Sequence, residues 1–142
     1  KTGPRAGAGA ANWHRAADAG RGYGARMEML AVGLCGFVVV AHVGFMVLEM
    51  FLWTTPFGLK TFGRTPQQAE DSKVLAANQG LYNGLLAALL AFAVVQASMP
   101  MRLAVLVCVV VAGVYGAATA KRSILFIQAL PAALAIGASL AS

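Results

Sequence analysis

Four long apolar stretches occupy most of the chain after residue 28. They cover residues 29–53, 74–99, 101–120 and 123–142 and contain few charged side chains. An α-helix rises about 1.5 Å per residue, so about 20 apolar residues cross a hydrocarbon layer of roughly 30 Å. The pattern therefore predicts an all-α fold, namely an integral membrane four-helix bundle made of two antiparallel hairpins.

The first 26 residues differ from the rest of the chain. Residues 1–26 are rich in glycine, alanine and arginine, contain one acidic residue and show no apolar periodicity. This composition predicts a disordered basic tail and a membrane domain over residues 27–142. An expression-derived segment, a mis-set start and a transit-like leader would all have this composition, and Met27 or Met29 is then a candidate native start.

Local signals mark the ends of the predicted helices. The longest connection, residues 54–73, contains proline and glycine breakers. Within it, Thr65 and Gln68 have the spacing of a capping box with Pro66 between them, so a helix is predicted to begin at Pro66. Pro131 interrupts the fourth apolar stretch and predicts a kink there.

Polar side chains gather at one depth of the predicted bundle. Counted from one membrane edge at about 1.5 Å per residue, all four stretches contribute to a layer about 6–8 Å deep, with its last two members a turn deeper. The layer consists of Glu49, Asn78, Gln79, Tyr115, Gln128, Tyr82 and Asn83. A polar group that faces lipid has no partner, so we expect these side chains to face the inside of the bundle. Gly80 and Gly84 share this segment and predict a face on which α-helices approach closely.

Glu49 is the strongest site candidate in the sequence. A charge near the bilayer centre costs about 2.5–3.5 kcal/mol, so Glu49 either takes up a proton or is held by nearby amide and phenol donors. His42 lies seven residues earlier on the same helix face, about 10.5 Å along the axis. That separation is too large for one shared metal ion, but it suits the two ends of a relay or of an elongated ligand.

A purely structural interpretation of these side chains is also open. Buried amides and tyrosines can act as interhelical contacts worth about 0.6 kcal/mol each in membrane proteins. The two cysteines, Cys35 and Cys108, lie in apolar stretches and are expected to be small core residues. The sequence contains no recognisable metal-ligand spacing and no cofactor motif.

Charge and composition restrict the class of partner. Only 11% of residues are charged, against about a quarter in soluble domains, which favours a membrane protein. The net charge of +6 is spread over the tail and the loops, so nucleic-acid binding is not expected. If the chain starts near Met27, the basic residues of the loops at 54–73 and 121–122 place both loops in the cytoplasm. If residues 1–26 belong to the native chain, their basic residues balance those of the two loops, and the charges no longer favour either orientation. A bacterial inner membrane is the expected location, with an organelle membrane as the alternative.

Several segments resemble a known family. These are residues 42–56 (HVGFMVLEMFLWTTP), 73–84 (KVLAANQGLYNG), 112–119 (AGVYGAAT) and 128–131 (QALP). From residue 27 to its C-terminus the chain resembles the small bacterial membrane-protein family known as domain of unknown function number 1304. The resemblance implies a polytopic four-helix protein with no assigned activity, and the tail departs from the family pattern.

Three functions are compatible with the sequence, and whether the protein is an enzyme stays open. The first is binding or acid/base transformation of a small apolar or lipid-like molecule, with Glu49 and His42 as the catalytic pair. The ligand-binding residues would then be Asn78, Gln79, Tyr82, Asn83, Tyr115 and Gln128. The second is a structural accessory subunit of a larger membrane complex. The third is a proton-coupled transporter that works as a homo-oligomer. Membrane lipid is the expected surrounding in each case.

Overall fold

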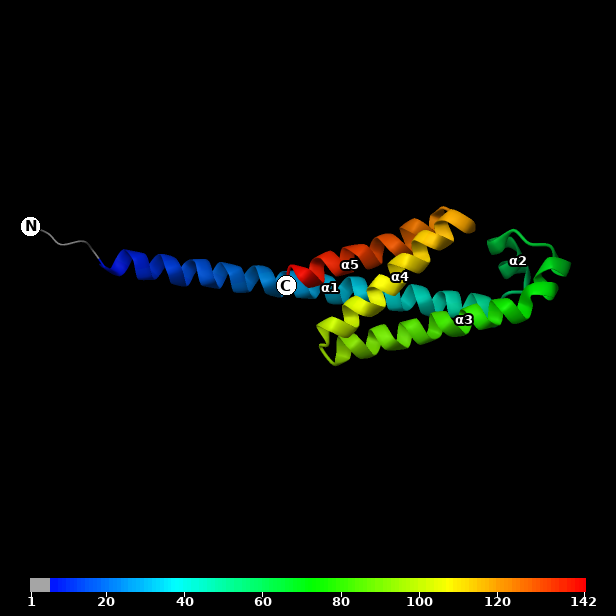
Figure 1. Cartoon of the computed structure of the whole chain (residues 1–142), viewed down its shortest axis with the longest axis horizontal. Coiled ribbons are helices and arrows are strands. Elements are labelled where there is room, and N and C mark those ends of the chain that lie inside the picture. Colours follow the sequence, from blue (N-terminus) through cyan, green and yellow to red (C-terminus); the bar gives the residue numbers. More distant parts are fainter. Residues whose placement is uncertain (1–5) are drawn as a thin grey trace, which may run out of the picture.

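The computed structural model describes the backbone of residues 6–142 and the side chains of residue 13 and residues 17–142. Over these residues the fold is all-α. Its elements are α1 (Ala6–Met50), α2 (Pro56–Phe62), α3 (Pro66–Val95), α4 (Met99–Thr119), the π-helical turn η1 (Leu125–Ala129) and α5 (Leu130–Leu140). Figure 1 shows α1, α3, α4 and α5 lying side by side.

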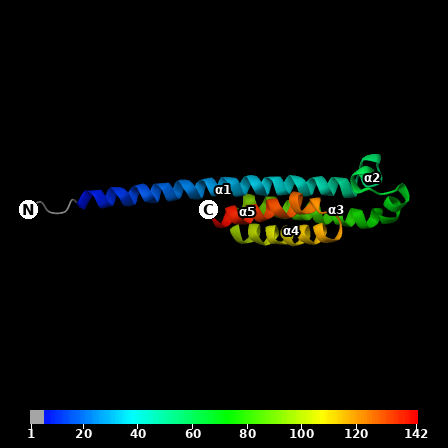
Figure 2. The same cartoon turned by 90° about the horizontal axis from the view of Figure 1, so that it is seen from above.

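The helices pack as a closed ring of neighbours. Helix α1 packs against α3 and α5, and α4 packs against the same two helices (Figures 1 and 2). The α1–α3 connection and the α4–η1 turn lie at one end of the bundle, which we call the loop end. The α3–α4 turn and the C-terminus lie at the opposite end, which we call the terminus end.

Three helical segments in the described part of the chain are long and apolar enough to cross a membrane. They are Ala17–Met50, Pro66–Val95 and Met99–Thr119, and a shorter apolar helix covers Leu125–Leu140. Many large apolar side chains on these helices face outward, among them Val40, Val95 and Val111. Such outward apolar surface is compatible with a membrane protein.

Aliphatic side chains of all four long segments build the core of the bundle, and glycines bring two of its helices close together. The central cluster includes Cys35, Val38, Leu90, Leu106 and Ala132, drawn from α1, α3, α4 and α5. The predicted close approach at the two glycines of α3 is confirmed. A Cβ atom added at Gly80 would lie 2.5 Å from Met50 Cγ, and one at Gly84 would lie 2.6 Å from Met46 Sδ.

The capping box at the start of α3 is confirmed. The Gln68 backbone N–H donates to Thr65 Oγ1 at 3.3 Å, and the Thr65 N–H donates to Gln68 Oε1 at 3.0 Å. The loop before α3 is more ordered than its proline and glycine residues suggest, because Thr55 caps the short helix α2. Its hydroxyl accepts from the Gly58 N–H at 3.2 Å.

A π-helical turn replaces the simple kink predicted at Pro131. The Leu130 N–H donates to Leu125 O, five residues back, and the α-helix resumes there. Proline has no N–H to donate, and its ring crowds the carbonyl four residues earlier. The extra residue held in the turn relieves that crowding, since π-bulges and prolines are the usual causes of sharp helix distortion.

The prediction of a disordered tail is wrong for residues 6–26, and residues 1–5 lie outside the described part. Helix α1 begins at Ala6 and projects beyond the terminus end of the bundle (Figure 1). This segment contains several alanines, the residue with the highest helix propensity. It is continuous with a long apolar helix, so lengthening α1 avoids the cost of a new helix nucleus.

Candidate functional site

Glu49 and Asn83 form a hydrogen bond between α1 and α3. Asn83 Nδ2 donates to Glu49 Oε2 at 2.7 Å, and both residues are half-buried. The neighbouring Gly80 makes this contact possible, because a Cβ atom there would lie 3.1 Å from Glu49 Cβ. The short side chain of asparagine reaches the carboxyl only because the two backbones lie this close together.

The partner of Glu49 differs from the residues expected at its depth. Counting along the helices placed Glu49 level with Asn78, whereas the structure pairs it with Asn83, five residues further along α3. Helical side chains tilt toward the N-terminus of their own helix. In an antiparallel pair the Glu49 side chain therefore leans away from the loop end, and the Asn83 side chain leans toward it. The two side chains therefore meet at a depth between those of their own Cα atoms.

His42 lies in the core, with 1% of its surface exposed. Its Nδ1 lies 2.9 Å from the carbonyl oxygen of Val38 in the preceding turn, and its ring lies edge-on to Phe45. A carbonyl only accepts hydrogen bonds, so Nδ1 carries a proton, and in the neutral form of the ring Nε2 is then an acceptor. Nε2 is buried and has no hydrogen-bond partner among the described residues. The partner of the His42 ring is therefore the backbone of its own helix and not a polar side chain of α3.

Four of the predicted site residues do not face the inside of the bundle, which corrects the expectation for them. Tyr82 is 62% exposed and Tyr115 is 71% exposed, and Asn78 and Gln79 are also exposed. Counting residues determines depth along a helix but not direction around it. Helix α3 turns its small residues toward α1 because they permit the closest packing. Asn78, Gln79 and Tyr82 of the same segment consequently face outward.

Gln128 takes an intermediate position. It is half-buried within η1, at the loop end of the fourth apolar stretch. The structure records no hydrogen bond between the Gln128 side chain and the other polar candidates in the described part of the chain. Glu49 and Asn83 are thus the two predicted site residues that the fold brings together, with His42 deeper on the same helix as Glu49.

The structure also contains a polar pair that the sequence analysis missed. Arg102 on α4 donates from Nη1 to Glu28 Oε1 at 2.9 Å and from Nη2 to Glu28 Oε2 at 3.2 Å. Arg102 is buried in the first turn of α4. Residues 28 and 102 both adjoin the terminus end of an apolar stretch and carry opposite charges. That shared depth was the signal that would have predicted the pair.

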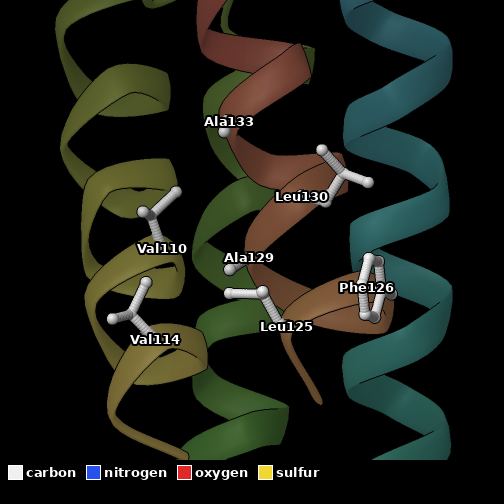
Figure 3. A pocket seen from close by; sticks show the side chains of 7 residues that line it. All are labelled: Val110, Val114, Leu125, Phe126, Ala129, Leu130 and Ala133. Atoms are coloured by element: carbon white, nitrogen blue, oxygen red, sulfur yellow. The ribbon is translucent and has the colours of Figure 1, made fainter. Parts of the chain in front are cut away.

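Two apolar grooves open on the surface of the bundle. The first, of about 290 Å³, lies between α4 and the η1–α5 segment and is shown in Figure 3. It is lined by Val110, Val114, Leu125, Phe126, Ala129, Leu130 and Ala133. The second, of about 240 Å³, lies between α1 and α3 and includes Cys35 and Val94. Neither groove is lined by Glu49 or His42.

The remaining reactive side chains lie apart from one another. Cys35 is buried as expected, whereas Cys108 is exposed, so the expectation of a core position is wrong for Cys108. Within the described residues, no three His, Cys, Asp or Glu side chains come together as a metal ion would require.

Comparison with known proteins identifies one related group. A family model described as "Protein of unknown function (DUF1304)" matches residues 36–140. This range contains His42, Glu49 and Asn83, and it leaves out Glu28. No curated protein and no solved structure matches the chain.

Proposed function

Because this chain belongs to the DUF1304 family, whose description assigns no activity, we propose a function from the geometry of the Glu49–Asn83 pair. The protein is an integral membrane four-helix bundle that binds a small lipid-like molecule carrying a hydrogen-bond donor, such as a long-chain alcohol or amine. Glu49 receives the donor group of the ligand, and the apolar helix surfaces receive its hydrocarbon part.

The length and composition of the helices support the membrane assignment. Three helical segments are long enough to cross, and the η1–α5 segment over Leu125–Leu140 would be the fourth crossing. Its length is roughly 24 Å at about 1.5 Å per residue, somewhat less than a hydrocarbon layer of roughly 30 Å. Local thinning of the bilayer accommodates a mismatch of this size.

The observation that carries the proposal is the incomplete hydrogen bonding of Glu49. Asn83 donates to Oε2, and the described residues supply no second donor to Oε1. A half-buried carboxyl among apolar helices gains from every donor it can find, because solvent is scarce there. A hydroxyl or amino group of an amphipathic molecule would satisfy Oε1, and ligand sites typically combine one such polar group with apolar walls.

His42 Nε2 is a further acceptor on α1, separate from Glu49. It has no hydrogen-bond partner within the described part of the chain, and it is buried deeper along α1 than Glu49. The two residues are seven positions apart, about 10.5 Å of helix rise, so they do not act on the same atom. This spacing favours binding over joint acid/base catalysis, and the catalytic roles of Glu49 and His42 stay predictions.

A second candidate function, an accessory subunit of a larger membrane complex, is favoured by a different observation. Asn78, Tyr82 and Tyr115 face outward from the bundle at positions where lipid would offer them no hydrogen bonds. A neighbouring protein would offer such bonds. Proton-coupled transport stays a prediction from sequence, because no described side chain hydrogen-bonds to both His42 and Glu49.

Photolabelling tests the ligand-binding proposal. The full-length protein is reconstituted in nanodiscs and exposed to a long-chain alcohol that carries a diazirine, and labelled peptides are quantified by mass spectrometry. Glu49→Leu is expected to lower labelling near residue 49 about tenfold, which corresponds to about 1.4 kcal/mol of lost hydrogen bonding. Glu70→Leu is the matched control, since Glu70 is an exposed acid at the start of α3.

Two outcomes would contradict the proposal, one from the variants and one from the polar group of the probe. Equal labelling of the wild type, Glu49→Leu and Glu70→Leu proteins would contradict the assignment of Glu49. Equal labelling by an alkane diazirine without a hydroxyl would show that the surface accepts any hydrocarbon, and that Glu49 selects nothing.

A further inference from the structure

Two exposed basic residues, Lys121 and Arg122, occupy the tight turn between α4 and η1 at the loop end. Backbone hydrogen bonds hold this turn. The Ile124 N–H donates to Lys121 O at 3.0 Å, and the Leu125 N–H donates to Arg122 O at 3.2 Å. Neither basic side chain forms an ion pair with an acidic side chain in the described part of the chain. The sequence has no aspartate or glutamate after Asp71, so no acidic side chain of the α4–η1–α5 hairpin offsets this charge.

The first apolar groove begins next to this basic turn and runs along the same two helical segments (Figure 3). Leu125, three residues after Arg122, lines the groove near the turn, and Ala133 lines it further along α5. The distance from residue 125 to residue 133 is about 12 Å at about 1.5 Å per residue. Half of a hydrocarbon layer of roughly 30 Å is about 15 Å, so the groove covers most of the depth of one leaflet. Positive charge at the loop end is therefore followed by an apolar channel of leaflet length.

We propose that this hairpin binds one anionic phospholipid, whose phosphate contacts Lys121 and Arg122 and whose acyl chain lies in the groove. The planar guanidinium of arginine matches two phosphate oxygens, and the lysine ammonium adds a point charge. Basic clusters at the ends of membrane helices favour anionic lipids in this way. The inference rests on the proposed membrane location but not on ligand binding at Glu49, because that residue lines neither the groove nor the turn.

The second groove, between α1 and α3, lacks such cations. It is nearly as large, at about 240 Å³, and Val32 and Val95 line it. Residues 96–98, which follow Val95 in the α3–α4 turn, are all neutral. On α1 the residue one turn before Val32 is Glu28, whose carboxylate is already paired with Arg102. An acyl chain of any lipid suits either groove, whereas an anionic headgroup is favoured only at the first.

Native mass spectrometry of the full-length protein in detergent tests the proposal. Phosphatidylglycerol and phosphatidylcholine with identical acyl chains are titrated separately, and the dissociation constant of the first bound lipid is measured. Each basic residue near the membrane surface contributes about fivefold to the binding of an anionic lipid. We expect Lys121→Gln combined with Arg122→Gln to raise the dissociation constant for phosphatidylglycerol about thirtyfold. The wild-type protein should bind phosphatidylglycerol about thirtyfold more tightly than phosphatidylcholine.

Lys60→Gln combined with Arg64→Gln is the matched control for charge. Both residues are exposed at the loop end, one in α2 and the other shortly after it. The control therefore removes the same charge from the same end of the bundle, and it should leave the dissociation constant for phosphatidylglycerol within about twofold. Circular dichroism confirms that each variant keeps its helix content.

A substitution within the groove tests the position of the acyl chain. Ala133 is exposed and lines the groove, so the ring of Ala133→Phe should occupy the space of the chain. Loss of contact with about two methylene groups raises the dissociation constant for phosphatidylglycerol about tenfold. Ala88→Phe, at an exposed alanine of α3 that does not line the groove, should leave it within about twofold.

Several results would overturn the proposal. Equal effects of the two charge-removing pairs would show that the whole loop end attracts anions. Equal effects of Ala133→Phe and Ala88→Phe would place the acyl chain elsewhere. Equal affinity of the wild-type protein for both lipids would show that no headgroup is selected. Displacement of phosphatidylglycerol by an equal concentration of inorganic phosphate would show a free-anion site.

A separate measurement distinguishes failure of this inference from failure of the proposed function. Release of the protein from vesicles by alkaline carbonate would contradict the membrane location and with it both proposals. If the protein stays in the vesicles and Glu49→Leu lowers photolabelling, the results listed above would overturn the phospholipid site alone.

Discussion

Arg102 and Glu28 join α4 to α1 at the terminus end through two hydrogen bonds, one to each carboxyl oxygen. The exposure of the two side chains is unequal. The Arg102 side chain is 4% exposed, whereas the Glu28 side chain is 42% exposed. The buried guanidinium therefore depends on a carboxylate that still contacts the surroundings, and its Nε has no partner among the described residues.

Removing the charge of Glu28 should destabilise the protein. Breaking a fully buried ion pair costs about 3–5 kcal/mol because one charge is left uncompensated, and the partial exposure of Glu28 reduces this. We expect Glu28→Gln to lower the free energy of unfolding by about 2 kcal/mol, measured by titrating the reconstituted protein with a denaturing detergent. Glu70→Gln, which removes the exposed partner of Lys73, should change it by about 0.5 kcal/mol or less. Equal effects of the two substitutions would show that burial of Arg102 is unimportant.

Glu49 and Asn83 should be coupled energetically. A double-mutant cycle with Glu49→Leu and Asn83→Leu isolates their interaction in the free energy of unfolding. Interhelical hydrogen bonds in membrane proteins average about 0.6 kcal/mol and reach about 1.7 kcal/mol, so we expect a coupling near the upper value for a carboxyl acceptor. The same cycle with Asn78→Leu should show no coupling, because Asn78 faces outward. A larger coupling with Asn78 than with Asn83 would contradict the observed pairing.

A side chain at Gly113 should destabilise the protein. A Cβ atom there would lie 2.8 Å from the backbone nitrogen of Ala129 and 2.9 Å from its Cβ, where α4 meets the end of η1. Backbone atoms cannot move aside as a flexible side chain can, so Gly113→Ala should cost about 1–3 kcal/mol of unfolding free energy. Gly137→Ala is the control, since a Cβ atom there meets no atom within 4 Å. It should be neutral or stabilising by up to about 1 kcal/mol.

Trp53 should hold the α1–α3 connection in place. Its indole N–H donates to Ala69 O at 3.1 Å and Ser72 Oγ at 3.2 Å, and the guanidinium of Arg64 lies 5.4 Å from the ring centroid. Trp53→Phe loses both hydrogen bonds and should speed amide hydrogen exchange in α2 severalfold. Ser72→Ala keeps the bond to Ala69 and should leave exchange nearly unchanged. Identical exchange in the wild type and Trp53→Phe proteins would show that other contacts order the loop.

Local features of the sequence were sufficient to predict much of this protein. Runs of apolar residues predicted the long helices, and the Thr65–Gln68 spacing predicted the start of α3. The presence of Gly80 and Gly84 predicted the close approach of α3 to a neighbour. These features act within a few residues of each other, through helix periodicity, capping and residue size. Glu49 and His42 stood out for the same reason, because polar side chains are rare in apolar stretches.

Only the tertiary structure decided which polar groups meet. Asn78, Gln79 and Asn83 lie within six residues, and their depths alone could not choose the partner of Glu49. The choice depends on rotation about the axis of α3, which the packing of Gly80 against α1 determines. The burial of Arg102 likewise required α1 and α4 to bring residues 74 positions apart together. Depth follows from counting along one helix, whereas direction follows from the faces that neighbouring helices bury against each other.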